Sequence, residues 1–236
     1  MAAVVLVAVL AVALSAGCTR SHADEGTGPA GSASSSATPS PSSGGTADPG
    51  RAEAPATVDT PLTFTVVGDS ITAGSLPIEG TAVPGTRSWL PAALGPPLEF
   101  QGGWAVPGAT TQDMRAGVVP SSADVVVVLA GTNDLFRLPW EVTADDLRAI
   151  VATVGVPRVL LSAIPPFDVD PAQAQGLNRQ LADLAAAQGW RYVDPWEGIS
   201  VDGAYAPGTS ADGVHPTQEV ADVVGRRLRA ELVGLR

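Results

Sequence analysis

The sequence predicts an α/β protein in which a parallel β-sheet lies between two layers of helices, a three-layer α/β/α sandwich. Short apolar runs rich in β-branched residues alternate along the chain with longer segments in which Ala, Leu, Arg and Gln recur at helical spacing. The run VVVVLA at residues 125–130 is apolar at every position. Such a run is typical of a strand in a parallel sheet that helices cover on both faces.

Five runs indicate strands, and three later segments indicate helices. The strand candidates are LTFTVV at 62–67, LEFQGG at 98–103, DVVVVLA at 124–130, RVLLSAI at 158–164 and WRYVD at 190–194. The helix candidates run from Thr143 to Val154, from Pro171 to Gln188 and from Pro216 to Val233. We therefore expect a parallel five-stranded sheet in one domain that spans residues 61–236.

The N-terminal region resembles a secretion signal. Residues 1–17 form an uncharged apolar run that ends in small residues, as a signal peptide does. Cys18 follows directly, and LSAGC resembles the lipobox at which bacterial lipoproteins are cleaved and acylated. The alternatives are cleavage near Ala13 or Ser15 by the ordinary signal peptidase, or an uncleaved anchor. An extracytoplasmic protein, either membrane-anchored or secreted, is expected.

Residues 18–60 are predicted to be a disordered tether. From Gly26 to Thr57 the chain consists of Gly, Ser, Ala, Thr and Pro apart from three charged residues, Asp48, Arg51 and Glu53. A segment of this composition has too little apolar surface to offset the entropy of folding. The tether would let the domain stand away from a membrane, with membrane contact only through a lipid anchor on Cys18.

The charge balance limits the partners. The chain has 13 basic residues, all of them Arg, and 24 acidic residues, so its formal net charge is −11. This acidity disfavours nucleic acids and anionic lipid headgroups as binding partners, and a neutral or sugar-like substrate fits better. One Cys cannot form an internal disulfide, and one Cys with one domain His offers too few ligands for a zinc site. We expect a monomer without metal or cofactor.

Ligands of parallel α/β domains bind beyond the carboxyl ends of the strands, where this chain carries short polar blocks. They are GDS at 68–70, GGWAVPGATT at 102–111, GTND at 131–134 and SADGVHPTQEV at 210–220. His215 is the single histidine of the domain, so it is nearly the only nitrogen base that could activate Ser70. Asp212 lies within reach of the other imidazole nitrogen, which it would orient. The alternative is a turn at Ser70, a helix-capping Asp212 and a surface His215.

The same blocks offer donors for an oxygen that becomes negative during acyl transfer. Asn133 offers a side-chain amide at the end of a buried strand, Gly108 offers a backbone N–H in a loop, and the Ser70 amide is a third donor. Stabilisation of local turns is the alternative role for Asn133 and Gly108. We interpret the remaining polar residues of the blocks as turn and hydrogen-bond scaffolding: Asp69, Thr110, Thr132 and Asp134.

In this order, GDSIT, GWAVPGAT, GTND and DGVHP resemble the motif blocks of the SGNH hydrolases, also called the GDSL family. The resemblance covers nearly the whole domain and implies a flavodoxin-like α/β/α fold. It implies that Ser70 is the nucleophile, His215 its base and Asp212 the acid that orients this base. It also implies an oxyanion hole formed by Ser70, Gly108 and Asn133. Trp104 departs from the family pattern, and no G-x-S-x-G elbow supports the common α/β-hydrolase fold.

The resemblance implies a serine esterase. Because the domain has no long apolar insertion that could form a lid, we expect a short-chain or acetyl ester of a small molecule or glycan. A cell-envelope glycan O-acyltransferase and a noncatalytic glycan-binding lipoprotein on the same fold are the alternatives. The substrate-binding residues are unknown, and the candidates beside the motif blocks are Trp104, Leu135, Phe136 and Val214.

Overall fold

A six-stranded sheet lies at the centre of the described part of the chain, residues 60–82 and 84–236 of a computed structural model. Across the sheet the strand order is β2, β3, β1, β4, β5 and β6. Their bounds are, respectively, Ile78–Gly80, Leu98–Ala105, Leu62–Gly68, Val125–Leu129, Arg158–Ser162 and Arg191–Val193. All neighbouring strands are parallel except β2 and β3. The five predicted parallel strands are thus confirmed.

β2 is an antiparallel edge strand that we did not predict. β2 has only three residues, of which Ile78 alone is buried. So short a strand cannot display the alternation of apolar and polar residues by which strands are recognised. It pairs with the end of β3, and Glu79 lies opposite Trp104. A separate two-stranded sheet joins β7 (Ser200–Val201) and β8 (Ala204–Tyr205).

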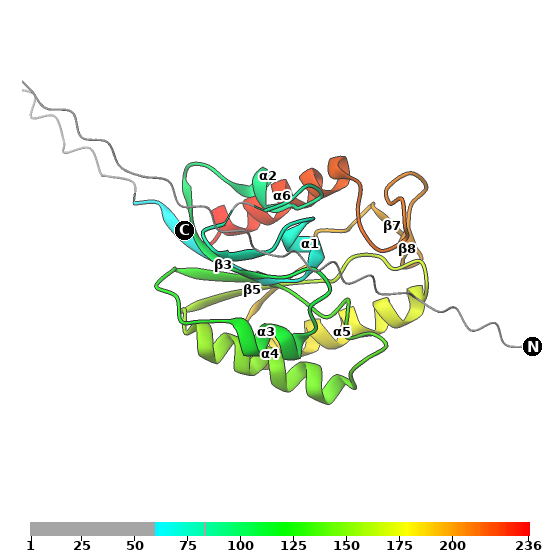
Figure 1. The fold of residues 1–236 in the computed structure, drawn as a ribbon, viewed down its shortest axis with the longest axis horizontal. Coiled ribbons are helices and arrows are strands. Elements are labelled where there is room, and N and C mark those ends of the chain that lie inside the picture. Colours follow the sequence, from blue (N-terminus) through cyan, green and yellow to red (C-terminus); the bar gives the residue numbers. More distant parts are fainter. Residues whose placement is uncertain (1–59, 83) are drawn as a thin grey trace, which may run out of the picture. The chain divides into compact units, whose positions relative to one another are not determined.

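Helices cover both faces of the six-stranded sheet (Figure 1). One face carries α2 (Leu90–Ala93) and α6 (Gln218–Val233), and the other carries α3 (Thr111–Gly117), α4 (Trp140–Val154) and α5 (Pro171–Gln188). Successive side chains of a strand point to opposite faces, and accordingly Val66 packs in one hydrophobic cluster while Val67 packs in the other. The predicted three-layer α/β/α architecture is confirmed.

The three long helices lie where the sequence predicts them, and the differences are at their starts. α5 has the predicted bounds. α4 begins earlier, after the N-cap residue Pro139, and α6 begins later because Thr217 caps it by accepting the Val220 N–H. The short helices α1 (Ser70–Ala73), α2 and α3 were not predicted, because a few residues show no helical periodicity.

Two features concern membranes and the N-terminal region. Within residues 60–82 and 84–236, no helix has the length and apolarity needed to cross a bilayer. The predicted signal peptide, Cys18 and all but the last residue of the predicted tether lie outside the described residues.

The carboxyl ends of three central strands meet at one edge of the sheet. Gly68, the last residue of β1, pairs with Ala105 of β3 on one side and with Leu129 of β4 on the other. Because these strands are parallel, the segments that follow them leave the same edge side by side. Those segments contain the first three motif blocks.

Two glycines inside long helices are expected to respond to alanine with opposite signs. A Cβ on Gly225 of α6 would lie 2.1 Å from the Trp89 carbonyl oxygen, whereas one on Gly176 of α5 would meet only Arg179, at 3.9 Å. Ala is favoured over Gly in a helix interior by about 1 kcal/mol. Gly176→Ala should therefore raise the free energy of unfolding in urea, and Gly225→Ala should lower it through overpacking. Stabilisation of both variants would contradict the close packing of α6 on α2.

Candidate active site

Ser70 lies at the turn from β1 into α1. The turn is tight, because a Cβ on Gly68 would lie 2.4 Å from the Thr72 hydroxyl and 2.9 Å from the Leu129 carbonyl oxygen. Asp69 caps α1 by accepting the Ile71 N–H at 2.9 Å. Ser70 is the first residue of α1 and is half-buried. The Gly-Asp-Ser sequence thus ends a core strand and presents the serine at the sheet edge.

The loop between β8 and α6 brings His215 to Ser70. Ser70 Oγ and His215 Nε2 are 2.9 Å apart, and His215 Nδ1 is 2.9 Å from Asp212 Oδ2. The other oxygen of Asp212 accepts the backbone N–H groups of Val214 and His215 at 3.0 and 2.7 Å. The carboxylate therefore folds back on the residues that follow it, and the three side chains form one hydrogen-bonded line.

Hydrogen bonds outside this line hold the loop. The Ser210 hydroxyl donates to the His215 carbonyl at 2.6 Å, and the Tyr205 hydroxyl donates to the Val214 carbonyl at 3.1 Å. Burial raises the pKa of Tyr205 far above its ordinary value, so this hydroxyl keeps its proton. The Tyr205 N–H in turn donates to Asp168 at 2.7 Å. The backbone that carries the imidazole is thus held at His215 itself and at the preceding residue, Val214.

Asp212 carries its negative charge throughout the neutral and mildly acidic range. Burial alone would raise the pKa of Asp212, but hydrogen bonds from the backbone and ring of His215 and from the Val214 N–H outweigh it and lower the pKa to about 2. A carboxylate can only accept hydrogen bonds, so Nδ1 of His215 bears the proton that faces it. Nε2 of a neutral imidazole is then the acceptor for the Ser70 hydroxyl.

The candidate oxyanion donors differ in their present bonding. Within the described residues, the N–H groups of Ser70 and Gly108 have no hydrogen-bond partner. Gly108 has a φ of +81°, and a Cβ there would meet nothing within 4 Å, so the backbone conformation and not space favours glycine. Asn133 Nδ2 donates to the Ala109 carbonyl at 3.0 Å and to Asp69 Oδ2 at 3.3 Å. Both amide hydrogens of Asn133 therefore face protein acceptors.

Asp69 links the segment that carries Ser70 to the segment that carries Asn133. Its carboxyl is fully buried and accepts from Ile71 through one oxygen and from Asn133 through the other. Burial, the largest cause, raises the pKa of Asp69 to about 7, and the nearby Asp134 carboxyl adds to the rise. The sequence indicates a turn at Asp69, but its contact with Asn133 joins residues 64 positions apart. No local pattern could have revealed that contact.

Asp134 fastens the Asn133 turn to two helices. Its oxygens accept the Thr111 N–H at 3.0 Å, the Thr111 hydroxyl at 2.6 Å and the Thr143 hydroxyl at 2.9 Å. Thr110 forms a capping box with Asp113 at the start of α3. Asp134 and Thr110 thus make scaffolding contacts. In the described ranges, no cluster of three His, Cys, Asp or Glu side chains could hold a metal ion.

The four candidates for substrate contacts differ in exposure. Leu135 is 7% exposed and packs in the cluster beneath α4 and α5, whereas Phe136 is 61% exposed. The Phe136 ring packs against Phe167 with centroids 5.8 Å apart. Trp104 and Val214 are half-buried, and Trp104 lines a cavity beside the second motif block. Phe136 and Trp104 thus offer the most accessible aromatic surface of the four.

A model of the GDSL-like lipase/acylhydrolase family matches residues 66–223, which include all four motif blocks. Since this match spans more than half of the chain, the protein belongs to that family. No curated protein sequence matches the chain.

Solved structures share the fold. A GDSL-like lipase from Bacteroides thetaiotaomicron has a TM-score of 0.59 and 21% identity, over 74% of this chain and 89% of that chain. A lipase/acylhydrolase from Enterococcus faecalis has a TM-score of 0.59 and 21% identity, over 73% of this chain and 96% of that chain. A carbohydrate esterase family 3 protein from Talaromyces cellulolyticus has a TM-score of 0.53 and 19% identity, over 74% of this chain and 97% of that chain. At these identities the likeness establishes the SGNH fold and no substrate.

The buried Asp69 carboxyl is expected to make folding pH-dependent. The unfolded chain loses this proton near pH 3.8, whereas the folded protein keeps it until about pH 7. Unfolding between these values releases a proton, so stability falls as the pH rises toward 7 and then levels off. From pH 5 to pH 9 the contribution of Asp69 to the free energy of unfolding should fall by about 3 kcal/mol.

Asp69→Asn tests this expectation by urea denaturation at the two pH values. An asparagine at position 69 cannot ionise. Between pH 5 and pH 9, the free energy of unfolding of the variant should therefore fall by about 3 kcal/mol less than that of the wild type. Asp124→Asn is the matched control, because hydrogen bonds from Thr63 lower the pKa of Asp124 and it is ionised at both values. An equal pH dependence in all three proteins would refute the assignment.

Proposed function

We propose that this chain is a serine esterase that hydrolyses short-chain or acetyl esters through a Ser70 acyl-enzyme. The observation that carries the proposal is the hydrogen-bonded line from Ser70 Oγ through His215 to Asp212. Membership of the GDSL-like lipase/acylhydrolase family supports ester hydrolysis in general. The net charge of −11 favours an uncharged substrate.

In the proposed acylation, His215 Nε2 takes the proton of Ser70 Oγ as this oxygen attacks the ester carbonyl carbon. The carbonyl oxygen becomes negative, and the imidazolium is stabilised by the Asp212 carboxylate. His215 then gives the proton to the departing alcohol oxygen, and the acyl group stays on Ser70. In deacylation, water replaces the alcohol and the same proton transfers run again, which releases a carboxylic acid and restores Ser70.

The N–H groups of Ser70 and Gly108 and the Asn133 amide are the proposed donors to the negative oxygen. The two backbone donors require no rearrangement, since they have no partner among the described residues. Asn133 must share a hydrogen that now faces a protein acceptor. The contact with Asp69, at 3.3 Å, is longer than that with Ala109, at 3.0 Å, so the Asp69 contact should yield first.

A serine-directed organophosphonate tests the proposal. Wild-type protein should carry the adduct on Ser70, as located by mass spectrometry of its peptides, and should hydrolyse 4-nitrophenyl acetate. His215→Ala should lose nearly all of both activities because Ser70 then lacks its base. Asn133→Ala should stay folded and lose roughly 100-fold in kcat, or about 3 kcal/mol, as removal of one oxyanion donor does. An adduct elsewhere, or none on folded wild-type protein, would exclude the mechanism.

For the N-terminal region we propose lipid attachment at Cys18, which lies outside the described residues. The proposal rests on the apolar residues 1–17 before Cys18 and on the polar tether after it. In a bacterial host, Cys18→Ser should move the full-length protein from the membrane fraction to soluble fractions. Unchanged membrane association would indicate an uncleaved anchor instead.

A further inference from the structure

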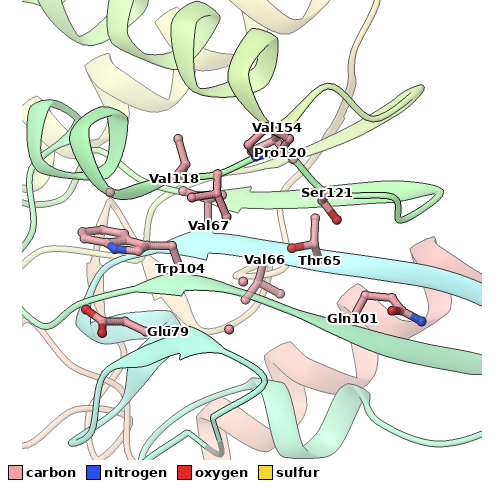
Figure 2. A pocket seen from close by; sticks show the side chains of 14 residues that line it. Thr65, Val66, Val67, Glu79, Gln101, Trp104, Val118, Pro120, Ser121 and Val154 are labelled. Carbon is pink, nitrogen blue, oxygen red and sulfur yellow. The ribbon is translucent and has the colours of Figure 1, made fainter.

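Two cavities adjoin at Trp104. One, of about 550 Å³, lies beside Gly108, and the other, of about 360 Å³, extends along β1 and β3 (Figure 2). Both are lined by Glu79, Trp104 and Gly117. The two cavities therefore meet at these three residues, and together they extend from the Gly108 loop past the indole ring and along β1 and β3.

Trp104 and Glu79 form a pair at this junction. They lie directly opposite each other on the antiparallel strands β3 and β2, so their side chains share one face. Figure 2 shows both at the same end of the cavity. A Cβ on Gly117 would lie 2.3 Å from the indole, so Gly117 supports the ring closely. Within the described chain, the indole N–H of Trp104 has no hydrogen-bond partner.

Asp113 adds a second carboxylate to the cavity beside Gly108. Its Oδ2 accepts the N–H and the hydroxyl of Thr110, at 2.9 and 2.7 Å, which fixes the carboxylate at the start of α3. Its Oδ1 accepts from no described residue. Glu79 is exposed. The cavity thus offers an aromatic ring, an N–H donor and two acidic acceptors, a set suited to the apolar faces and hydroxyl groups of a sugar.

The two sides of Ser70 differ in polarity. The β3 side holds Trp104, Glu79 and Asp113, whereas the β4 side holds the exposed Phe136 ring against Phe167. In the strand order β2, β3, β1, β4, the serine that follows β1 lies between them. An ester bound at Ser70 directs its acyl and alcohol parts away from each other, so the polar part should occupy the β3 side.

We propose that the cavity formed by Trp104, Glu79 and Asp113 binds the alcohol part of the substrate, and that this part is a neutral sugar. The inference rests on the proposed esterase function and specifies its substrate as an O-acylated glycan. The guanidinium of Arg137 lies beside the same cavity, because it donates to the Gly108 carbonyl at 3.3 Å and, after the hydrogen bonds from Thr110, its charge lowers the pKa of Asp113. It offsets part of the negative charge of the two carboxylates, and the preference for a neutral sugar therefore rests on the net charge of −11. The adjoining cavity in Figure 2, which ends near Gln101 and Ser121, gives room for a further sugar unit.

Glu79→Gln tests the proposal through substrate selectivity. The measured quantity is kcat/KM for an acetylated methyl xyloside divided by kcat/KM for 4-nitrophenyl acetate. Loss of a hydrogen bond to a charged acceptor should lower this ratio about tenfold, mainly through KM for the sugar ester. Glu99→Gln is the matched control, since Glu99 is an exposed acid on the neighbouring strand β3 and lines neither cavity. An unchanged ratio in Glu79→Gln, or an equal fall of the ratio in Glu99→Gln, would overturn the sugar assignment.

Direct binding separates this inference from the proposed chemistry. In a Ser70→Ala background, calorimetric titration with the acetylated xyloside should show binding that Glu79→Gln weakens about tenfold and Glu99→Gln leaves unchanged. Equal affinity in all three proteins, or no binding, would refute the sugar site whatever the wild-type activity. Wild-type protein that binds the xyloside but hydrolyses neither ester would instead refute the esterase function alone.

Discussion

The geometry of the candidate site depends on the buried carboxyl of Asp69. One oxygen accepts the Ile71 N–H and fixes the turn that presents Ser70. The other accepts from Asn133, whose amide also donates to the Ala109 carbonyl. These contacts join the segments that follow β1, β4 and β3. A single side chain therefore sets how the proposed nucleophile lies relative to the loops that carry its proposed oxyanion donors.

The two acids beside Ser70 have opposite electrostatic properties. Asp69 is fully buried and its pKa is raised to about 7, whereas the side chain of Asp212 is 45% exposed and its pKa is lowered to about 2. Protonated Asp69 can still accept a hydrogen bond without placing a full negative charge near a developing oxyanion. Ionised Asp212 faces the imidazole that becomes positive in the proposed reaction. Environments that separate the pKa values of neighbouring acids in this way suit acid–base chemistry.

The features visible in the sequence are those with a local signal. The apolar run of β4 and the periodicity of α5 identify core elements, and the spacing from Asp212 to His215 identifies a carboxylate that folds back on an imidazole. β2 and α1 to α3 are too short for periodicity to be recognised. Contacts such as Asp69 with Asn133, or Glu79 opposite Trp104, depend on strand order and register, which no local pattern encodes.

Strand order also gives the site its two unlike sides. In the chain, the segment with Gly108 and the segment with Asn133 both come after Ser70, yet the parallel crossovers place β3 and β4 on opposite sides of β1. If β1 lay at the edge of the sheet, donors could approach Ser70 from one side only. A central β1 instead allows one donor on each side and leaves each flank free to differ. The β3 flank is acidic and carries an indole, and the β4 flank carries an exposed phenyl ring. The same topology that supports the proposed oxyanion hole can therefore distinguish the two ends of an ester.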